Sequence, residues 1–354
     1  MKRLYWLSGL FALFSAMSQS WAFIDYPYAV NFQTIRLPML PLGESEMPAG
    51  AFSVRQSFRL INVWSMQADR FLIDGEEFQS ETSLRYSVSA NFQAGFSIPY
   101  QVRSGGFLDS SIEAFHRGFG LTQDHREMYP ENRVNVSYEP FGKYYPLLDN
   151  NPLNTFLRNY ERRKYPFKAL PGLDQFFHLT LVPTQTASAA SPGDPRVFQQ
   201  YHAFHESGSI PSIFVGAQWK LPAGSGNMMG TPGVDTSFFL TLLKHLDSFV
   251  FQMGASYTTF AIRHYGLISL PGDQFVLRTS AVYLWNNFGF LLEYVYFTAP
   301  TRELGRLSRP GTQAAAGFTY TRENTKAVAA VVENFGNYGV TPDIGFLVSI
   351  ETRP

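Results

Sequence analysis

The sequence predicts an all-β protein, a transmembrane antiparallel β-barrel of about twelve strands with fourteen as the alternative count. Apolar and polar residues alternate along most of the chain, which is typical of strands with one apolar and one wet face. Aromatic residues make up 16% of the chain and charged residues only 16%, whereas ordinary soluble domains carry about 25% charged residues. The chain has no cysteine, which excludes both a disulfide framework and a lipid-attachment cysteine.

Residues 1–22 predict a cleaved secretory signal peptide. Lys2 and Arg3 precede an apolar run over 4–14, and small residues flank a cleavage site before Phe23. The run is too short for a comfortable transmembrane helix. An uncleaved N-terminal anchor is the alternative.

The charge balance excludes nucleic acid as a partner. Removing the two basic residues of the signal peptide from 28 leaves 26 against 28 acidic residues, which is not the basic surface that nucleic acid requires. A secreted, aromatic-rich chain of alternating strands predicts the outer membrane of a Gram-negative bacterium. The expected partners are outer-membrane lipids and lipopolysaccharide, the barrel-assembly machinery for insertion, and a small-molecule solute. A soluble periplasmic sandwich or lipocalin-like barrel is the alternative.

After the signal peptide, residues 23–49 are rich in proline and predict a periplasmic or lumenal N-terminal segment rather than a strand. The barrel is expected over 50–354.

The first predicted strand, 51–64, shows the pattern of the others. Phe52, Val54 and Phe58 lie on one face, and Arg55 and Arg59 lie on the other. Each strand is near the ~9–11 residues that a tilted strand needs to cross a bilayer. The other strands are 79–90, 92–102, 213–221, 234–243, 249–257, 274–285, 288–296, 312–321, 325–335 and 343–351.

The strand count leaves an ambiguity. Including 132–140 and 175–184 gives thirteen strands, but single-chain bacterial barrels close with an even number. Either 103–174 is one large external excursion and the barrel has twelve strands, or 196–206 (Arg196 to Glu206) is a further span and it has fourteen. Prolines that bracket 132–140 favour twelve.

Loop lengths favour a membrane barrel over a soluble one. Short turns are expected at 90–92, 244–247, 286–287 and 322–324, and they alternate with long connections at 65–78, 103–131, 259–273 and 299–310. This is the layout of outer-membrane barrels, with short turns in the periplasm and long loops outside.

Within the 103–131 connection, residues 105–120 predict a short amphipathic helix. Asp109 follows a diglycine and is a candidate N-cap, and Ile112, Phe115, His116 and Phe119 share one face. A helix in an external loop needs a surface to pack on, so we expect a lid or constriction over the lumen. Its candidate constriction residues are Asp109, Glu113, His116 and Arg117.

Three motifs carry a resemblance to a known family. They are the run 105–121 preceded by 96–100, the segment 220–224, and Glu333-Asn334 with 341–343. They resemble an uncharacterised proteobacterial outer-membrane barrel family, the domain of unknown function 3187. The resemblance covers nearly the whole mature chain. It implies the barrel fold and provides no established substrate or catalytic residue.

Charged residues fall on the inner faces of the predicted strands, so we expect them to line the barrel lumen. A barrel of about twelve strands can either pack such an interior shut or leave a narrow pore, since wide aqueous channels need about 16–18 strands. The mixed charge argues against a strongly ion-selective pore. The candidate lumen residues are Arg55, Arg59, Glu81, Arg85, Lys220, Arg278 and Glu293. We therefore expect a narrow channel or transporter for a small solute.

Two other functions stay open. A lipid-modifying enzyme would use Ser110 or Ser111 with His116 and an acidic orienting residue, although five positions separate Ser111 from His116 and no Gly-x-Ser-x-Gly elbow is present. A closed structural barrel is the other alternative. No catalytic, cofactor-binding or metal-binding residue is assigned, and no cofactor is expected.

Two surface clusters have weaker signals. His202, His205 and Glu206 have the residue types of a metal site, but the local pattern predicts a strand or loop rather than a helix that would bring both imidazoles together. A basic cluster could contact lipopolysaccharide phosphates if its loop lies outside. Its residues are Arg158, Arg162, Arg163 and Lys164.

Overall fold

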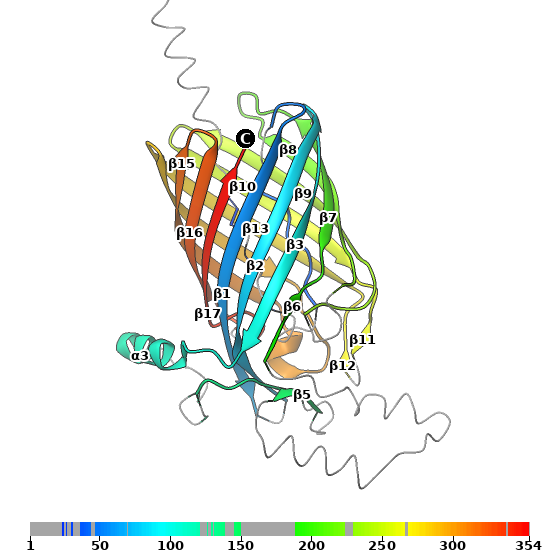
Figure 1. Cartoon of the computed structure of the whole chain (residues 1–354), viewed down its shortest axis with the longest axis vertical. Helices are drawn as coiled ribbons and strands as arrows, with labels where there is room; N and C mark the ends of the chain where they lie inside the picture. The colour runs from blue at the N-terminus through cyan, green and yellow to red at the C-terminus, as the bar shows by residue number, and fades with distance from the viewer. Residues whose placement is uncertain are drawn as a thin grey trace, which may run out of the picture.

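The computed structural model describes residues 23–24, 26, 30, 36–43, 47–68, 70–120, 126, 129, 131–138, 145–149, 188–223, 229–265, 268–337 and 339–353. Within these residues, twelve strands form a barrel (Figure 1). They are β1 (Phe52–Gln67), β2 (Phe71–Ser89), β3 (Phe92–Ser104), β7 (Arg196–Phe204), β8 (Ser212–Lys220), β9 (Asp235–Leu246), β10 (Phe249–Thr259), β13 (Asp273–Trp285), β14 (Phe288–Phe297), β15 (Gly311–Arg322), β16 (Thr325–Asn334) and β17 (Ile344–Thr352).

The sheet closes on itself, and every pair in the ring is antiparallel. The first strand pairs with the last through Val54 and Thr352, and β3 pairs with β7 through Phe92 and Tyr201. Closure satisfies the backbone donors and acceptors between strands, so no edge is left to face lipid.

The expected count of twelve is confirmed, but one strand differs in identity. Residues 196–206 were expected to span only if the barrel had fourteen strands, whereas β7 is one of the twelve because it pairs with both β3 and β8. Residues 132–140 do not span. They contain the short strand β4 (Asn135–Tyr138), which pairs with residues 71–74 at the start of β2 and with β5 (Tyr145–Asp149). The expected strand at 175–184 lies outside the described residues.

The outer wall is apolar, as the alternation predicts. Phe58, Phe251 and Leu292 are 44%, 42% and 50% exposed, and many other large apolar side chains project outward from the twelve strands. An apolar belt of this size on a closed barrel is the surface that meets lipid. Among the described residues, no helix is long and apolar enough to cross a membrane.

The connections are short at one end of the barrel and long at the other (Figure 1). Two-residue turns lie at 247–248, 286–287 and 323–324, where Asp247, Asn286 and Glu323 have positive φ, as tight hairpins require. The long connections carry the remaining elements. These are α3 (Asp109–Phe119), β6 (Ala189–Pro192), β11 (His264–Tyr265), β12 (Ile268–Ser269) and the 3₁₀ helix η4 (Gly305–Ser308).

The expectation of a long connection at 65–78 is wrong. Strand β1 continues to Gln67 and β2 begins at Phe71, so the two strands form a hairpin that extends past the rest of the barrel. Residues 61–65 are buried on both faces of this extension. The alternation of apolar and polar residues that marks a half-exposed strand is therefore absent here, and so the sequence pattern does not predict the hairpin.

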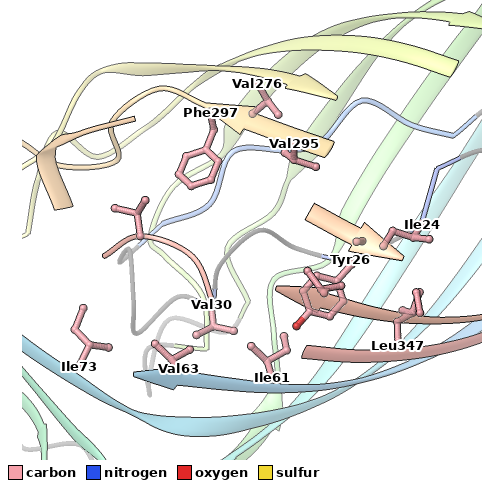
Figure 2. Packing of buried hydrophobic residues seen from close by; sticks show 14 of the residues in the cluster. Ile24, Tyr26, Val30, Ile61, Val63, Ile73, Val276, Val295, Phe297 and Leu347 are labelled. Atoms are coloured by element: carbon pink, nitrogen blue, oxygen red, sulfur yellow. The ribbon is translucent and has the colours of Figure 1, made fainter. Parts of the chain in front are cut away.

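An apolar core lies inside the barrel. Figure 2 shows Ile24, Tyr26 and Val30 of the N-terminal segment packed among inward-facing side chains of the wall. All three are 1% exposed. Their wall neighbours in the cluster include Ile61, Val63, Val276, Val295, Phe297 and Leu347.

Candidate functional site

The described part of the N-terminal segment lies in the barrel lumen. Thr258 accepts a hydrogen bond from the backbone N–H of Met39 at 3.2 Å, and Ser256 donates to the carbonyl of Met39 at 2.7 Å. Gln218 donates to the carbonyl of Leu40 at 2.6 Å. Proline-rich segments present backbone groups that no strand partner satisfies. Here, uncharged inward-facing side chains of β8 and β10 are the hydrogen-bond partners of those backbone groups. These bonds connect residues 39 and 40 to inward-facing side chains of the barrel wall.

Two wall glycines allow the segment to approach closely. A Cβ on Gly345 would lie 1.6 Å from the Tyr26 hydroxyl oxygen, and one on Gly254 would lie 2.9 Å from atoms of both Phe23 and Pro41. Any larger residue at these positions would displace the segment. The wall is therefore shaped to hold this segment.

The start of the segment is anchored at a buried ion pair. The backbone N–H of Ile24 donates to Glu293 at 3.0 Å, and Glu293 pairs with Arg278 at 2.9 Å. The Arg278 guanidinium lies 4.4 Å from the centre of the Phe23 ring, within cation–π range. Arg278 and Glu293 were both predicted to face the lumen, and the structure brings them together.

A cavity of about 90 Å³ remains beside residues 37–40. Arg59 donates to Gln79 at 2.7 Å and lies 3.4 Å from Glu81, which also pairs with Arg196 at 2.6 Å. Both signs of charge therefore face the same space. The residues that line it are Leu37, Pro38, Met39, Leu40, Arg59, Gln79, Glu81, Pro99, Gln101, Asp194, Arg196, Lys220, Met229 and Thr231.

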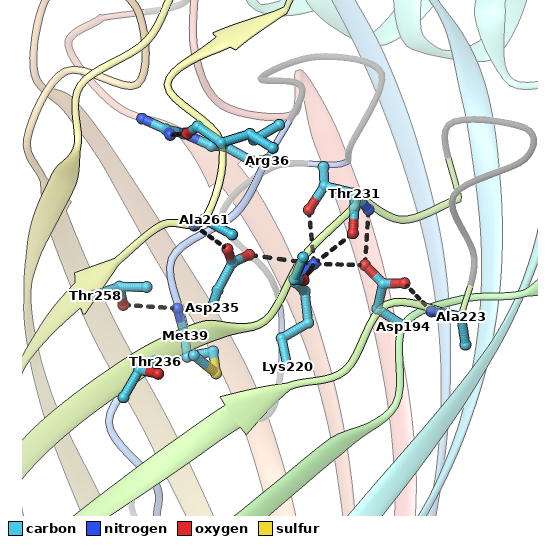
Figure 3. Close-up of polar contacts among 12 residues, drawn as sticks. Arg36, Met39, Asp194, Lys220, Ala223, Thr231, Asp235, Thr236, Thr258 and Ala261 are labelled. Atoms are coloured by element: carbon cyan, nitrogen blue, oxygen red, sulfur yellow. Dashed lines mark hydrogen bonds and ion pairs between the residues drawn. The ribbon is translucent and has the colours of Figure 1, made fainter.

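At one end of this cavity, Lys220 joins the long connections (Figure 3). Its Nζ lies 3.0 Å from Asp194 and 3.3 Å from Asp235, and it donates to the Thr231 hydroxyl at 2.7 Å. Asp235 accepts from the backbone N–H of Ala261 at 2.9 Å. One buried cation thus links the connections before β7, after β8 and after β10.

Arg36 ties the lumenal segment to the same region. Its guanidinium donates to the carbonyl oxygens of Ile262 and Pro271 and lies 3.9 Å from the centre of the Phe260 ring. The segment is therefore held at the long-loop end as well as at the ion pair near its start.

The predicted lumen residues are found on the inner face. Arg59, Glu81, Arg85, Lys220, Arg278 and Glu293 are buried, and Arg55 is half-buried. Arg85 donates weakly to the carbonyl of Gly43, at 3.4 Å. Their positions follow the strand alternation. The participation of Asp194, Thr231 and Asp235 was missed, because Asp194 and Thr231 lie in loops that have no alternation.

The helix α3 does not lie over the lumen. Figure 1 shows it outside the outline of the barrel. Its Ile112 and His116 are buried, Glu113 is half-buried, and Phe115 and Arg117 are exposed. The sequence predicted that α3 would form a lid or constriction over the lumen. In the structure, Asp109, Glu113, His116 and Arg117 lie outside the barrel instead.

Asp109 is not the N-cap that the sequence predicted. The helix begins at Asp109 with Leu108 as N-cap, and no side chain of the cap residue bonds to the helix. Glu76 instead accepts from the backbone N–H groups of Phe107 at 3.1 Å and Leu108 at 2.6 Å. The carboxylate of Asp109 accepts from Asn62 at 3.2 Å and pairs with Arg126. These contacts fix the helix on the outer face of the β1–β2 extension.

The serines of the enzyme hypothesis are not near a buried base. Ser110 and Ser111 are exposed, while His116 is buried on the side of α3 that faces the barrel. Asp109 is engaged with Arg126. The arrangement gives no specific support to nucleophilic catalysis, which needs the nucleophile and base within hydrogen-bond reach.

The structure describes the candidate metal group at 202–206 but not the basic cluster at 158–164. The rings of His202 and His205 are 3.8 Å apart, but Glu206 turns to Lys244 at 2.8 Å and to His245 at 2.7 Å. Burial alone would raise the pKa of the Glu206 carboxyl, but the hydrogen bonds from Lys244 and His245 hold that pKa below its ordinary value. The basic cluster of Arg158, Arg162, Arg163 and Lys164 lies outside the described residues.

These features define a class: a transmembrane antiparallel β-barrel whose lumen holds its own N-terminal segment. The family model described as "Protein of unknown function (DUF3187)" matches residues 15–145 and 185–353. The chain belongs to this family. No protein with a curated description matches it.

Solved structures of similar shape include a porin, an autotransporter translocator domain and a toluene transporter. The NanC porin has 7% identity and a TM-score of 0.43, covering 85% of this chain and 99% of that chain. The translocator domain of the autotransporter NalP from Neisseria meningitidis has 7% identity and a TM-score of 0.39, covering 87% and 90%. The toluene transporter TbuX of Ralstonia pickettii has 11% identity and a TM-score of 0.38, covering 87% and 90%.

Proposed function

We propose that the protein is a gated outer-membrane channel for a small polar solute, with the N-terminal segment 23–43 as its gate. The observation that carries this proposal is the way the lumen is filled. The backbone of residues 36–43 is held by hydrogen bonds with uncharged wall side chains, which donate to its carbonyls and accept from the N–H of Met39. They do not belong to any strand of the barrel.

Such a gate can open without unfolding the barrel. Each of these hydrogen bonds contributes only about 1 kcal/mol net, because water replaces the partner. The chain has no cysteine that could lock the segment covalently. Residues 23–30 contribute apolar anchors, Phe23, Ile24, Tyr26 and Val30, all of them buried. We infer that 37–43 moves first, while these anchors and Arg36 keep the segment attached.

The lining indicates the class of solute. Arg59 and Lys220 face the cavity together with Glu81 and Asp194, so the path offers both donors and acceptors. A zwitterionic or polyhydroxylated small molecule satisfies both, whereas a simple ion is opposed by one sign or the other. About twelve strands give a lumen too narrow for bulky solutes.

The same proposal includes how the protein reaches its place. Residues 1–22 act as a cleaved signal peptide, and the barrel-assembly machinery inserts the mature chain with its apolar belt in lipid. Contact of the basic cluster at Arg158 to Lys164 with lipopolysaccharide remains part of this proposal.

Conductance in planar bilayers tests the gate. A chain that lacks 23–43 is expected to show larger or more frequent openings than the full mature chain, because the obstruction is gone. Gly254→Leu offers a second route, since its side chain would occupy the space of Phe23 and Pro41. Heat-modifiable migration on gels checks that each variant is a folded barrel. Folded variants whose conductance equals that of the full chain would refute the gate and favour a closed structural barrel.

A further inference from the structure

Three potential metal ligands meet where α3 lies against the outer wall. His116 comes from α3, Glu333 from the end of β16, and Asp343 from the residue before β17. One nitrogen or carboxylate oxygen from each lies within 4.8 Å of the others. The group is remote in sequence and is assembled only by the packing of α3 on the barrel.

Glu333 projects to the outer side of the barrel wall. Along β16, Val328, Ala330 and Val332 are buried in the interior, while Val331 is 44% exposed on the outside. Glu333 follows Val331 by two positions, so it lies in the outward row. None of the three residues is among those that line the cavity beside 37–40, and an inference about the cluster does not depend on the proposed function.

The imidazole of His116 is buried without a full set of partners. His116 is 5% exposed, and its Nδ1 has no hydrogen-bond partner among the described residues. A buried polar atom left unsatisfied costs on the order of a lost hydrogen bond. A ligand at this position would remove that cost.

The charge around the cluster is unbalanced toward acid. Arg126 is shared by Asp109, Asp343 at 3.5 Å and Asp74 at 3.9 Å. Within the described part of the chain, no basic side chain forms an ion pair with Glu333. Several carboxylates thus gather around one guanidinium in a largely buried region, where uncompensated charge is costly. A bound cation would restore the balance.

We propose that His116, Glu333 and Asp343 bind one divalent transition-metal ion of the Zn²⁺ type, which fastens α3 to the barrel wall at the long-loop end. Zn²⁺ takes imidazole nitrogen and carboxylate oxygen as ligands, and three protein ligands with a water in the fourth position complete a tetrahedral site. Mg²⁺ and Ca²⁺ prefer ligand sets made of oxygen alone. Ligand atoms around Zn²⁺ lie roughly 3.3 Å apart, so binding draws the three side chains together by rotamer adjustment.

Metal titration of the full mature chain in detergent tests the site. After treatment with a chelator, the protein is titrated with Zn²⁺ in a calorimeter and with Co²⁺ by absorbance, which reports the coordination directly. We expect about one equivalent to bind, with Ca²⁺ and Mg²⁺ much weaker. His116→Ala and Glu333→Gln should each weaken Zn²⁺ binding at least tenfold and alter the Co²⁺ spectrum.

His264→Ala is the matched control. His264 is an exposed histidine in another long connection, so its removal should leave binding unchanged. Heat-modifiable migration confirms that each variant is folded. Amide exchange gives a second measure: Zn²⁺ should slow exchange in α3 of the wild type but not of His116→Ala.

Two outcomes would overturn the proposal. One is a folded wild type that takes up no Zn²⁺ at micromolar concentrations. The other is binding that survives in both His116→Ala and Glu333→Gln and is lost in His205→Ala, which would place the metal at the His202–His205 pair at the opposite end.

Discussion

Lys220 contacts several buried groups inside the barrel. It contacts Asp194, Asp235 and Thr231 from a position where its residue is only 9% exposed. Its removal leaves two buried carboxylates without this cation, and breaking a buried pair in this way costs several kcal/mol.

Lys220→Met is therefore expected to lower the free energy of unfolding by about 3 kcal/mol or more. Urea unfolding in detergent, followed by tryptophan fluorescence, measures this change. Lys244→Met is the matched control, because Lys244 also pairs with a carboxylate, Glu206, but both side chains are more exposed. Its removal should cost much less stability. Equal losses in the two variants would contradict a special role for the Lys220 cluster.

The sequence could predict which face a residue lies on but not its partners. The alternation placed Arg59 and Glu81 inside, and they are indeed buried neighbours. Partners depend on register, which a periodicity of two does not specify. Asp194 could not be predicted as a partner of Lys220, because it reaches the site from a loop.

Among the elements, strands were predictable wherever one face meets lipid. The alternation ends where both faces become covered, and so the pattern predicts a loop where the structure has the β1–β2 extension. The helix at 105–120 was predictable from its apolar spacing, but that spacing does not say which surface it covers. The contacts of Asp109 with Asn62 and Arg126 decide this, and they place α3 on the outer wall.

This position changes what removal of the helix should do. Deletion of 107–119 should leave single-channel conductance in planar bilayers unchanged, because α3 does not lie in the path through the lumen. The full mature chain and the chain without 23–43 are the references on either side. An increase in conductance comparable to that of the gate deletion would contradict the outer position and restore the constriction hypothesis.

For the whole molecule, parity of the strand count was a reliable constraint. It demanded an even number and excluded thirteen, and the structure resolves the choice as twelve with β7 included. The filled lumen could not be predicted, because the proline-rich residues before β1 are compatible with both a periplasmic and a lumenal position. Only the match between backbone groups of 36–43 and the wall side chains distinguishes the two.

Orientation in the membrane is the remaining property of the whole molecule, and the cysteine-free chain makes it directly measurable. Long loops are expected outside the cell and short turns in the periplasm. Arg302→Cys lies in the connection between β14 and β15, and Asn324→Cys lies in the short turn between β15 and β16; both residues are exposed. A membrane-impermeant maleimide added to intact cells should label the cysteine at 302 and not the one at 324. Permeabilised cells should give both labels, which shows that each cysteine is reactive. Labelling at 324 alone in intact cells would invert the barrel and place α3, with its three candidate metal ligands, in the periplasm.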